Sequence, residues 1–529
     1  MTWMNGAQAV IKVLENHGIH HVFGLPGGAV LSLYDALRES SITHTLVRHE
    51  AAAAHAASGY ARATGSVGVC IATSGPGATN LLTGIAAATM DSIPLVAITG
   101  QVPSNLIGRD VFQEVDMPGA SAPFAKHVMQ PRNAADLPRM ITEAIHIART
   151  GRPGAVVVDI PSDVAAAQAN MDFSQKINLP GYHPVVEGHP LQIRKIRSAL
   201  AASQRPLILA GGGVLSAGAW EPLRELAERL GAPVALTMMG LGAFPASHPL
   251  CLGMTGMHGD RRALQALAQA DLVLVAGARL GDRGRVEHTL RPGTVLIHMD
   301  ADPAEIGKTL RTDIPVVGDI ASILRALPDA SLPPRKPWDF PAPHADDHPM
   351  AALMRRVGQL LPEDTLITTD VGQHQLWAAR YLPVDAPRSF ITSGGLGVMG
   401  YGLPAAIGVC MGTGKNALLI TGDGSFQMHL PELATLAASG AQVKILLLDN
   451  GTLGLVRELQ DDHQDGRHFG VHLNGNPDFC TLAAAYGLPA RSASAEDDEA
   501  LSWLIRQSGS ALLRVVIPKG LDAKSIQEV

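Results

Sequence analysis

Short apolar runs recur along the chain, and each ends at a glycine or a polar turn. Amphipathic stretches such as PLRELAERL lie between them and predict helices. Continuous apolar runs that alternate with helices are typical of buried parallel strands covered by helices on both faces. The runs that we interpret as strands begin at Val67 (VGVCIATSGPG), Pro94 (PLVAITG), Ala155 (AVVVDIP), Pro206 (PLILAGGG), Leu272 (LVLVAGAR), Val295 (VLIHMD), Leu366 (LITTDVG), Ala417 (ALLITGDG) and Val443 (VKILLLDN).

Two stretches, 166–192 and 327–348, lack this periodicity and are richer in Pro, Asp, Asn and Ser. We interpret them as linkers. The predicted fold class is therefore α/β, with three domains at 1–165, 186–328 and 349–529, each a mostly parallel sheet flanked by helices. In such sheets ligands bind at the carboxyl ends of the strands, which is where the glycine clusters fall.

Length and composition exclude several classes of protein. A chain of 529 residues is too long for one core. No apolar run is long enough for a membrane helix, and the first residues lack the features of a signal peptide. A net charge of −7 without basic runs gives no reason to expect nucleic acid. The four cysteines are scattered, which favours a reducing cytoplasm over a disulfide framework or a zinc site.

The most specific chemical signal is an acidic glycine turn followed by an amide turn. Gly422-Asp423-Gly424-Ser425 follows the predicted strand ALLIT, and Asp449-Asn450-Gly451 follows the next one. Glycines at a helix start let backbone N–H groups approach a phosphate, but Asp423 would repel that phosphate unless a cation lay between them. Mg²⁺ commonly bridges a carboxylate to phosphates in this way. The alternative is two ordinary turns, because both sequences are good turn formers.

A second signal is Glu50, which ends the apolar run LVRHE and begins a helix of small residues. A carboxylic acid in such surroundings suits an acid–base role. The alternative is a helix acid favoured by the helix dipole. FGLPGGAV from Phe23 and ATSGPGATN from Ala72 flank Glu50 in the same predicted domain.

Together these motifs resemble the thiamin-diphosphate signature, which runs from GDG to a paired amide. The resemblance implies that Asp423, Asn450 and the carbonyl of Thr452 bind Mg²⁺, with Asp449 replacing the first amide of the pair. It implies that Glu50 activates the aminopyrimidine ring and that the halves of each site come from different subunits. It implies that Met399 is the apolar wedge beneath the cofactor and that the Gly397 carbonyl receives the aminopyrimidine. The other residues that it assigns to cofactor binding are Val371, Gly372, Gln373, His374, Gly424 and Ser425.

Nearly the whole chain resembles the catalytic subunit of acetohydroxyacid synthase (acetolactate synthase). The strings that carry this resemblance are RHEAAAAHAASGYARATG, CIATSGPGATNLLTGIAAA, DSIPLVAITGQVP, FQEVD, GRPGAVVVDIP, GMTGMHG, TTDVGQHQLWAAR and GYGLPAAIG. The resemblance implies pyrimidine-binding, central FAD-binding-like and diphosphate-binding domains. It implies FAD without a redox role, held by Arg152, Gly211, Gly212, Gly213, Gly256, Met257, His258, Gly277, Arg279, Asp300 and Asp319.

Such enzymes decarboxylate pyruvate and transfer the fragment to a second 2-oxo acid. The resemblance places Glu50, Gly28, Phe112, Gln113 and Arg283 at the catalytic centre. An arginine can bind the carboxylate of the acceptor with two hydrogen bonds. An exposed, ion-paired Arg283 is the alternative.

Three departures from the family concern the substrate end. The family's tryptophan after the metal loop is Leu459, the lysine of its DIPKD string is Ser162, and its Pro/Gly-rich tail is missing after VVIPKGLDAKSIQEV. A related enzyme that mainly decarboxylates, or that uses another acceptor, therefore stays an alternative. A homodimer or homotetramer is expected. The sequence leaves a regulatory subunit and the pathway open.

Overall fold

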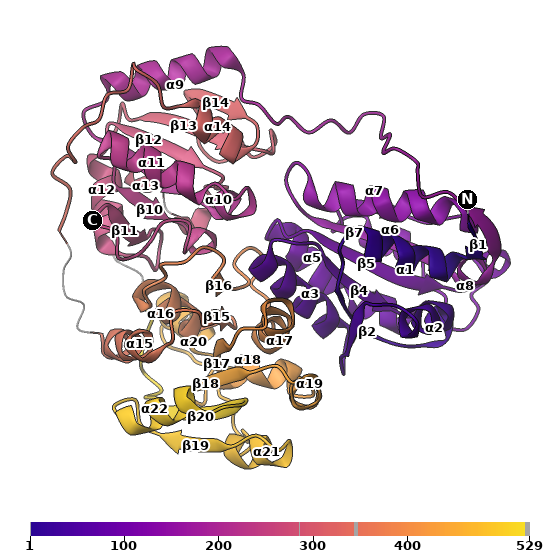
Figure 1. Ribbon diagram of the computed structural model, residues 1–529. Coiled ribbons are helices and arrows are strands. Elements are labelled where there is room, and N and C mark those ends of the chain that lie inside the picture. Colours follow the sequence, from indigo (N-terminus) through magenta and orange to yellow (C-terminus); the bar gives the residue numbers. More distant parts are fainter. Residues whose placement is uncertain (1, 285, 343–347, 524–529) are drawn as a thin grey trace.

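The structure, a computed structural model, describes residues 2–284, 286–342 and 348–523. Figure 1 shows three layered α/β units, each built on its own sheet. Within the described ranges each of these sheets has six parallel strands. The predicted α/β class is therefore confirmed, and every apolar run that we interpreted as a strand forms one.

The N-terminal sheet has the strand order β3-β2-β4-β5-β7-β6. Its central strands β4, β5 and β7 are buried along their whole length, which explains why their sequences are mostly apolar. The strands are β2 (His21–Leu25), β3 (Thr43–Leu46), β4 (Gly68–Ala72), β5 (Leu95–Gln101), β6 (His127–Met129) and β7 (Ala155–Pro161). The helices are α1 (Gly6–Asn16), α2 (Leu31–Arg38), α3 (Glu50–Thr64), α4 (Pro76–Asn80), α5 (Leu82–Met90), α6 (Met117–Ser121), α7 (Leu137–Arg149) and α8 (Ser162–Ala166).

The central sheet has the order β11-β10-β9-β12-β13-β14. The strand order reverses between the neighbouring parallel strands β9 and β12, and each of these two strands ends in a glycine turn. The strands are β9 (Pro206–Ala210), β10 (Val234–Leu236), β11 (Cys251–Met254), β12 (Leu272–Ala276), β13 (Val295–Asp300) and β14 (Ile314–Val317). The helices are α9 (Pro190–Ala202), α10 (Gly212–Ser216), α11 (Trp220–Leu230), α12 (Arg261–Gln269), α13 (Val286–Thr289) and α14 (Ile320–Ala326).

The C-terminal sheet has the order β16-β15-β17-β18-β20-β19. Since β17 lies between β15 and β18 and all three are parallel, the turns that follow them meet at one edge. The strands are β15 (Leu366–Thr369), β16 (Phe390–Ile391), β17 (Ala417–Gly422), β18 (Val443–Asp449), β19 (Ala490–Ala493) and β20 (Ala511–Val516). The helices are α15 (Pro349–Leu360), α16 (Gln373–Tyr381), α17 (Gly402–Thr413), α18 (Asp423–Phe426), α19 (Glu432–Ser439), α20 (Gly454–His463), α21 (Phe479–Ala485) and α22 (Asp498–Arg506).

Helices α3 and α17 join the N-terminal and C-terminal units (Figure 1). They cross closely at glycines, because a Cβ on Gly59 would collide with the backbone of Ala405 and one on Gly408 with the backbone of Ala56. This packing buries nearly all of α3. The helix that begins at Glu50 is thereby fixed against the unit that carries Asp423.

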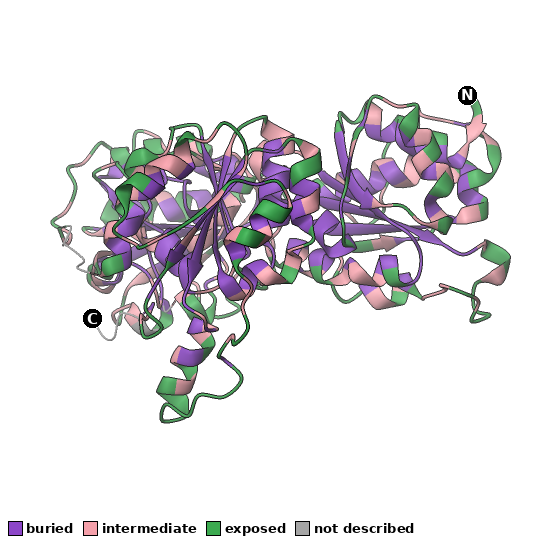
Figure 2. Ribbon diagram, turned by 90° about the horizontal axis from the view of Figure 1, so that it is seen from below, coloured by how far each residue is buried: buried purple, intermediate pink, exposed green. Residues whose placement is uncertain are grey.

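The stretch predicted as the first linker contains strand β8 (Gln168–Met171), which pairs antiparallel with β1 (Thr2–Asn5). The stretch predicted as the second packs on the central unit through Arg335, whose guanidinium donates to the carbonyls of Ser203 and Leu200. Figure 2 shows the buried residues concentrated in the strands and the exposed ones on the outer helices. No helix in the described ranges combines the length and apolar character that crossing a membrane requires.

Candidate active site

The turns after β15, β17 and β18 bring the predicted metal and diphosphate residues to one edge of the C-terminal sheet. Asn450 donates from its amide to Gln373 Oε1 at 2.9 Å, which joins the turns after β15 and β18. Ser425 donates to the carbonyl of Val371 at 2.6 Å, which joins those after β15 and β17. Gln373 also donates to the Leu521 carbonyl at 2.8 Å.

Asp423 is buried, and its Oδ2 accepts a hydrogen bond of 2.8 Å from Asn476. Burial raises the pKa of the Asp423 carboxyl to about 6, the bond from Asn476 lowers it, and the nearby Asp449 carboxylate raises it. Asp449 itself pairs with Arg514 at 2.7 Å. Because Arg514 offsets the charge of Asp449, the buried Asp423 carboxylate is the charge that a bound cation would neutralise.

Two buried polar atoms at this edge have no hydrogen-bond partner, Oγ1 of Thr452 and Nε2 of His374. The His374 ring lies against Gly372 and Gly422, where added Cβ atoms would come within 2.5 Å and 2.7 Å of it. Burial lowers the pKa of His374 to about 3, although a hydrogen bond to the Asp370 carbonyl opposes that shift. A bound phosphate would favour the protonated ring and give Nε2 an acceptor.

These residues fit a Mg²⁺–diphosphate group. Asp423, Asn450 Oδ1 and the Thr452 carbonyl are oxygen donors of the kind that Mg²⁺ prefers. Within the described part of the chain, no group of three His, Cys, Asp or Glu side chains is placed to hold a metal. A site made from one carboxylate, one amide and one carbonyl does not require such a group.

The loop before α17 leans over this edge. Met399 Cε lies 3.7 Å from where a Cβ on Gly424 would stand. Gly397 has a positive φ of 72°, is exposed, and has no atom within 4 Å of an added Cβ. The loop therefore holds Met399 against the predicted diphosphate turn and leaves Gly397 open to a ligand.

Glu50 begins α3 and is 8% exposed. Its Oε2 accepts a hydrogen bond of 2.9 Å from the side chain of Asn80, and its Oε1 lies 3.2 Å from where a Cβ on Gly77 would stand. One carboxylate oxygen is therefore fixed, while the other faces a glycine. In the described part of the chain the Glu50 carboxylate bonds to Asn80, whereas Asp423 bonds to Asn476.

The other predicted catalytic residues of this unit lie in loops around Glu50. Gly28 is exposed, and the next residue, Ala29, donates its N–H to Thr73 Oγ1 at 3.3 Å. Gln113 has a φ of 59° and packs on Gly75, where an added Cβ would come within 2.9 Å of its Cα. Phe112 is 88% exposed at the tip of the same loop. The surface formed by these loops is therefore exposed in a single chain.

The three glycines after β9 make a close crossing with the turn after β12. A Cβ on Gly213 would lie 2.7 Å from Gly277 Cα, and one on Gly212 would lie 3.2 Å from the Met239 carbonyl. Gly211 donates its N–H to the Ala276 carbonyl at 2.9 Å. Close packing therefore explains these three glycines independently of the predicted flavin contact.

Arg283 lies beside the GMHG string. Its carbonyl accepts the N–H of Met257 at 2.9 Å, and an added Cβ on Gly256 would come within 2.6 Å of that carbonyl. The guanidinium is 70% exposed and lies 3.5 Å from Asp282. His258 contacts the Ala523 carbonyl at 3.1 Å, which connects the central unit to the end of the C-terminal unit.

The remaining predicted flavin contacts have structural partners. Arg152 lies 3.1 Å from Asp302 and 2.7 Å from Glu305, and so bridges the N-terminal and central units. Burial raises the pKa of Asp300 to about 6. Asp319 caps α14 by accepting the N–H of Ser322.

Arg279 is different, because it faces the junction of the three units. Its Nη2 lies 2.9 Å from where a Cβ on Gly395 would stand. Asp91 accepts the N–H of Gly395 at 2.5 Å there, and burial raises its pKa.

Sequence reasoning missed Asn80, Asn476 and Asp370. Asn80 and Asn476 lie 30 and 53 residues from the carboxylates that they contact. Asp370 and Asn80 carried a usable signal, since Asp370 directly precedes the predicted diphosphate turn and Asn80 ends the string ATSGPGATN.

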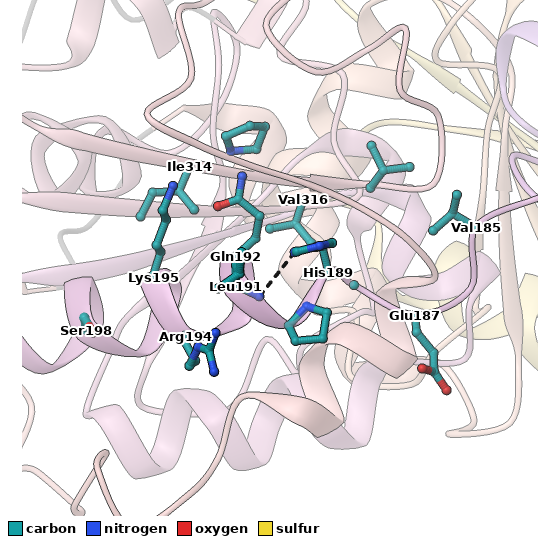
Figure 3. A pocket seen from close by; sticks show the side chains of 14 residues that line it. Val185, Glu187, His189, Leu191, Gln192, Arg194, Lys195, Ser198, Ile314 and Val316 are labelled. Carbon is teal, nitrogen blue, oxygen red and sulfur yellow. Dashed lines mark hydrogen bonds between the residues drawn. The ribbon is translucent and has the colours of Figure 1, made fainter.

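A surface groove lies between α9 and β14 and is lined by His189, Leu191, Lys195 and Val316 among others (Figure 3). The residues that line it include none of those predicted for the active site. We therefore assign it no part in the chemistry.

Comparison with known proteins finds one family whose models match all three units of the chain. Three family descriptions match: "Thiamine pyrophosphate enzyme, N-terminal TPP binding domain" over residues 4–120, the "central domain" over 193–327 and the "C-terminal TPP binding domain" over 370–515. The chain is 45% identical to a probable acetolactate synthase large subunit of Methanocaldococcus jannaschii, over 97% of this chain and 92% of that protein. It is 45% identical to an acetolactate synthase of Mycobacterium bovis, over 94% and 84%, and 44% identical to an acetolactate synthase large subunit of Corynebacterium glutamicum, over 92% and 82%.

Proposed function

Because the chain belongs to the thiamine pyrophosphate enzymes and, within them, to the acetolactate synthase large subunits, we propose that it joins two molecules of pyruvate into 2-acetolactate with release of CO₂. The observation that carries this proposal is the presence of two half-sites in one chain. Glu50 and Asn80 form one, and the edge around Asp423 and Asn450 forms the other. We take 1–165, 186–328 and 349–529 as the corresponding domains.

Mg²⁺ would be held by the Asp423 carboxylate, Asn450 Oδ1 and the Thr452 carbonyl. His374 and the backbone N–H groups of Gly424 and Ser425 would bind the phosphates, because a ring nitrogen without a partner and the N–H groups at a helix start can both donate hydrogen bonds to an anion. Thiamin diphosphate, when bound, supplies the nucleophilic carbon and the electron sink for decarboxylation and transfer.

The protein positions the reacting groups and moves protons. Glu50 would hold a proton at Oε1 and exchange it with the pyrimidine ring, while the bond from Asn80 keeps Oε2 in place. Met399 would support the folded cofactor as an apolar wedge. The Gly397 carbonyl would accept a hydrogen bond from the pyrimidine amine. Arg283 would bind the acceptor carboxylate, with Phe112 and Gln113 beside it. No side chain is required as a nucleophile.

We further propose FAD without a redox role between the glycine turns of the central unit and Arg279, and at least a homodimer. The exposure of Phe112 and Arg283 supports a site that a partner chain completes. The proposed acceptor is pyruvate, because Leu459 presents a half-exposed apolar side chain on α20 where the resemblance expects the tryptophan that favours a larger 2-oxo acid.

One assay tests this function. Purified protein is incubated with thiamin diphosphate, Mg²⁺ and pyruvate, with and without 2-oxobutyrate, and the products are identified. We expect acetolactate from pyruvate alone. Acetaldehyde as the main product would instead indicate a decarboxylase, and no turnover of pyruvate would contradict the proposal.

A further inference from the structure

Asp370 is a buried carboxylate to which the proposed function gives no part. It follows β15 directly and is 1% exposed. Its Oδ1 accepts the N–H of Gly400 at 2.7 Å and that of Val371 at 3.0 Å, and Oδ2 lies 3.5 Å from the Thr421 hydroxyl. The N–H of Gly402 also bonds to this carboxylate.

These donors come from three different parts of the candidate site. Val371 begins the predicted diphosphate turn, Gly400 follows Met399 in the wedge loop, and Thr421 precedes the Gly422-Asp423 metal turn. Asp370 also accepts at its own carbonyl from the His374 ring. One residue therefore connects the loop for the ring end of the cofactor to the two turns for its phosphorylated end.

A carboxylate suits this position because its backbone neighbours are all donors. Gly402 opens α17, so the negative charge also lies at the positive end of a helix. Burial raises the pKa of Asp370 to about 6, and the hydrogen bonds from Val371, Gly400 and Gly402 oppose that shift. A buried carboxylate without a cationic partner costs free energy, so several hydrogen bonds must offset its desolvation.

We propose that Asp370 is a positioning residue that sets the distance between the Met399 wedge loop and the diphosphate and metal turns. The proposal rests on the proposed thiamin-dependent function. Inorganic diphosphate needs only the phosphate end of the site, whereas thiamin diphosphate needs both ends at the correct spacing. Loss of Asp370 must therefore weaken the larger ligand more than the smaller one.

The test compares two ligands on the full-length protein by titration calorimetry with excess Mg²⁺. For Asp370→Ala we expect the Kd of thiamin diphosphate to rise by about tenfold more than that of inorganic diphosphate, the size of one lost buried hydrogen bond. Asp370→Asn keeps one oxygen that can accept the N–H of Gly400, so it should change the ratio of the two Kd values less. If the alanine variant does not fold, the asparagine variant carries the test.

Asp271 supplies matched controls. Its carboxylate also accepts two backbone N–H groups, from Gln204 at 2.8 Å and Arg205 at 3.0 Å, and a serine hydroxyl, but in the central unit. Asp271→Ala and Asp271→Asn should leave the ratio of the two Kd values unchanged. An equal loss for both ligands, or no loss, in the Asp370 variants would overturn the proposal. A wild-type protein that binds thiamin diphosphate no better than diphosphate would contradict the thiamin assignment itself.

Discussion

The Asn80 side chain donates a hydrogen bond of 2.9 Å to Glu50 Oε2 and leaves Oε1 facing Gly77. The carboxyl group is thereby oriented with one oxygen occupied and the other available. That arrangement suits an acid that exchanges a proton with a ring nitrogen. A helix acid present only for the dipole would not need an amide to orient it.

Conversion of Glu50 to Gln preserves the shape of the side chain and removes the titrating group. We expect thiamin diphosphate to bind with little change and kcat to fall by about 10²-fold or more. Steady-state kinetics and cofactor titration on the same preparation check this. The exposed Glu39→Gln is the control and should be neutral. A kcat close to wild type for Glu50→Gln would remove Glu50 from the mechanism.

Removal of the divalent ion should weaken cofactor binding, because the Asp423 carboxylate would then repel the diphosphate. Protein dialysed against a chelator should lose thiamin diphosphate and regain it on addition of Mg²⁺. Asp423→Asn should raise the Mg²⁺ concentration for half-maximal binding by about tenfold or more, as expected for loss of one anionic ligand. The exposed Asp364→Asn serves as control. Equal Mg²⁺ requirements would argue against the assigned ligand.

The close approach of Gly213 to Gly277 predicts a stability effect. An added methyl group at Gly213 would lie 2.7 Å from Gly277 Cα, and backbone cannot yield as a side chain can. We expect Gly213→Ala to destabilise the central unit by about 1–3 kcal/mol and to lower its unfolding temperature by several degrees. Gly509→Ala, which meets no atom within 4 Å, should change little. Similar unfolding temperatures for the two variants would refute the packing argument.

The strands that the sequence predicts best are the buried central ones. β7 and β17 are continuous apolar runs followed by turns, so periodicity and burial agree. The predicted runs leave out several strands, among them β3, an edge strand with mixed exposure, and β16, which has two residues. Edge strands bury less surface, and their sequences are correspondingly less apolar.

Within the candidate site, the residues that sequence could predict are those in local turns. Asp423 and Asn450 end their strands, so their proximity follows from parallel neighbours in one sheet. Asn476 reaches its carboxylate from a loop, and Asn80 from the end of helix α4. Their roles depend on how these segments pack, and no local pattern determines that.

Burial of His55 predicts loss of stability in acid. Both ring nitrogens lack hydrogen-bond partners, and the ring packs 5.4 Å from Tyr401. Burial, aided by His429 and His49, lowers its pKa from 6.5 to about 3. The unfolded chain therefore takes up a proton below pH 6.5 that the folded chain does not, so stability is lost as pH falls through 6.5.

At pH 5, one such histidine lowers the free energy of unfolding by about 2 kcal/mol. We expect His55→Gln to reduce the drop in unfolding temperature between pH 7.5 and pH 5, whatever its effect at pH 7.5. The exposed His20→Gln should leave that drop as it is in wild type. The same drop in His55→Gln as in wild type would contradict the prediction.

A site shared between subunits makes a prediction that a site within one chain cannot. Glu50→Gln and Asp423→Ala each inactivate one half-site. In a mixed dimer, one active site would contain both substitutions, while the other would contain intact Glu50 from one chain and intact Asp423 from its partner. In a dimer that contains one chain of each variant, about half of the sites should therefore be intact. Co-expression with two different affinity tags and assay of the doubly purified dimer measures this, with each variant alone as control. Were Glu50 and Asp423 to act within one chain, each mixed dimer would contain two defective sites and no activity would return.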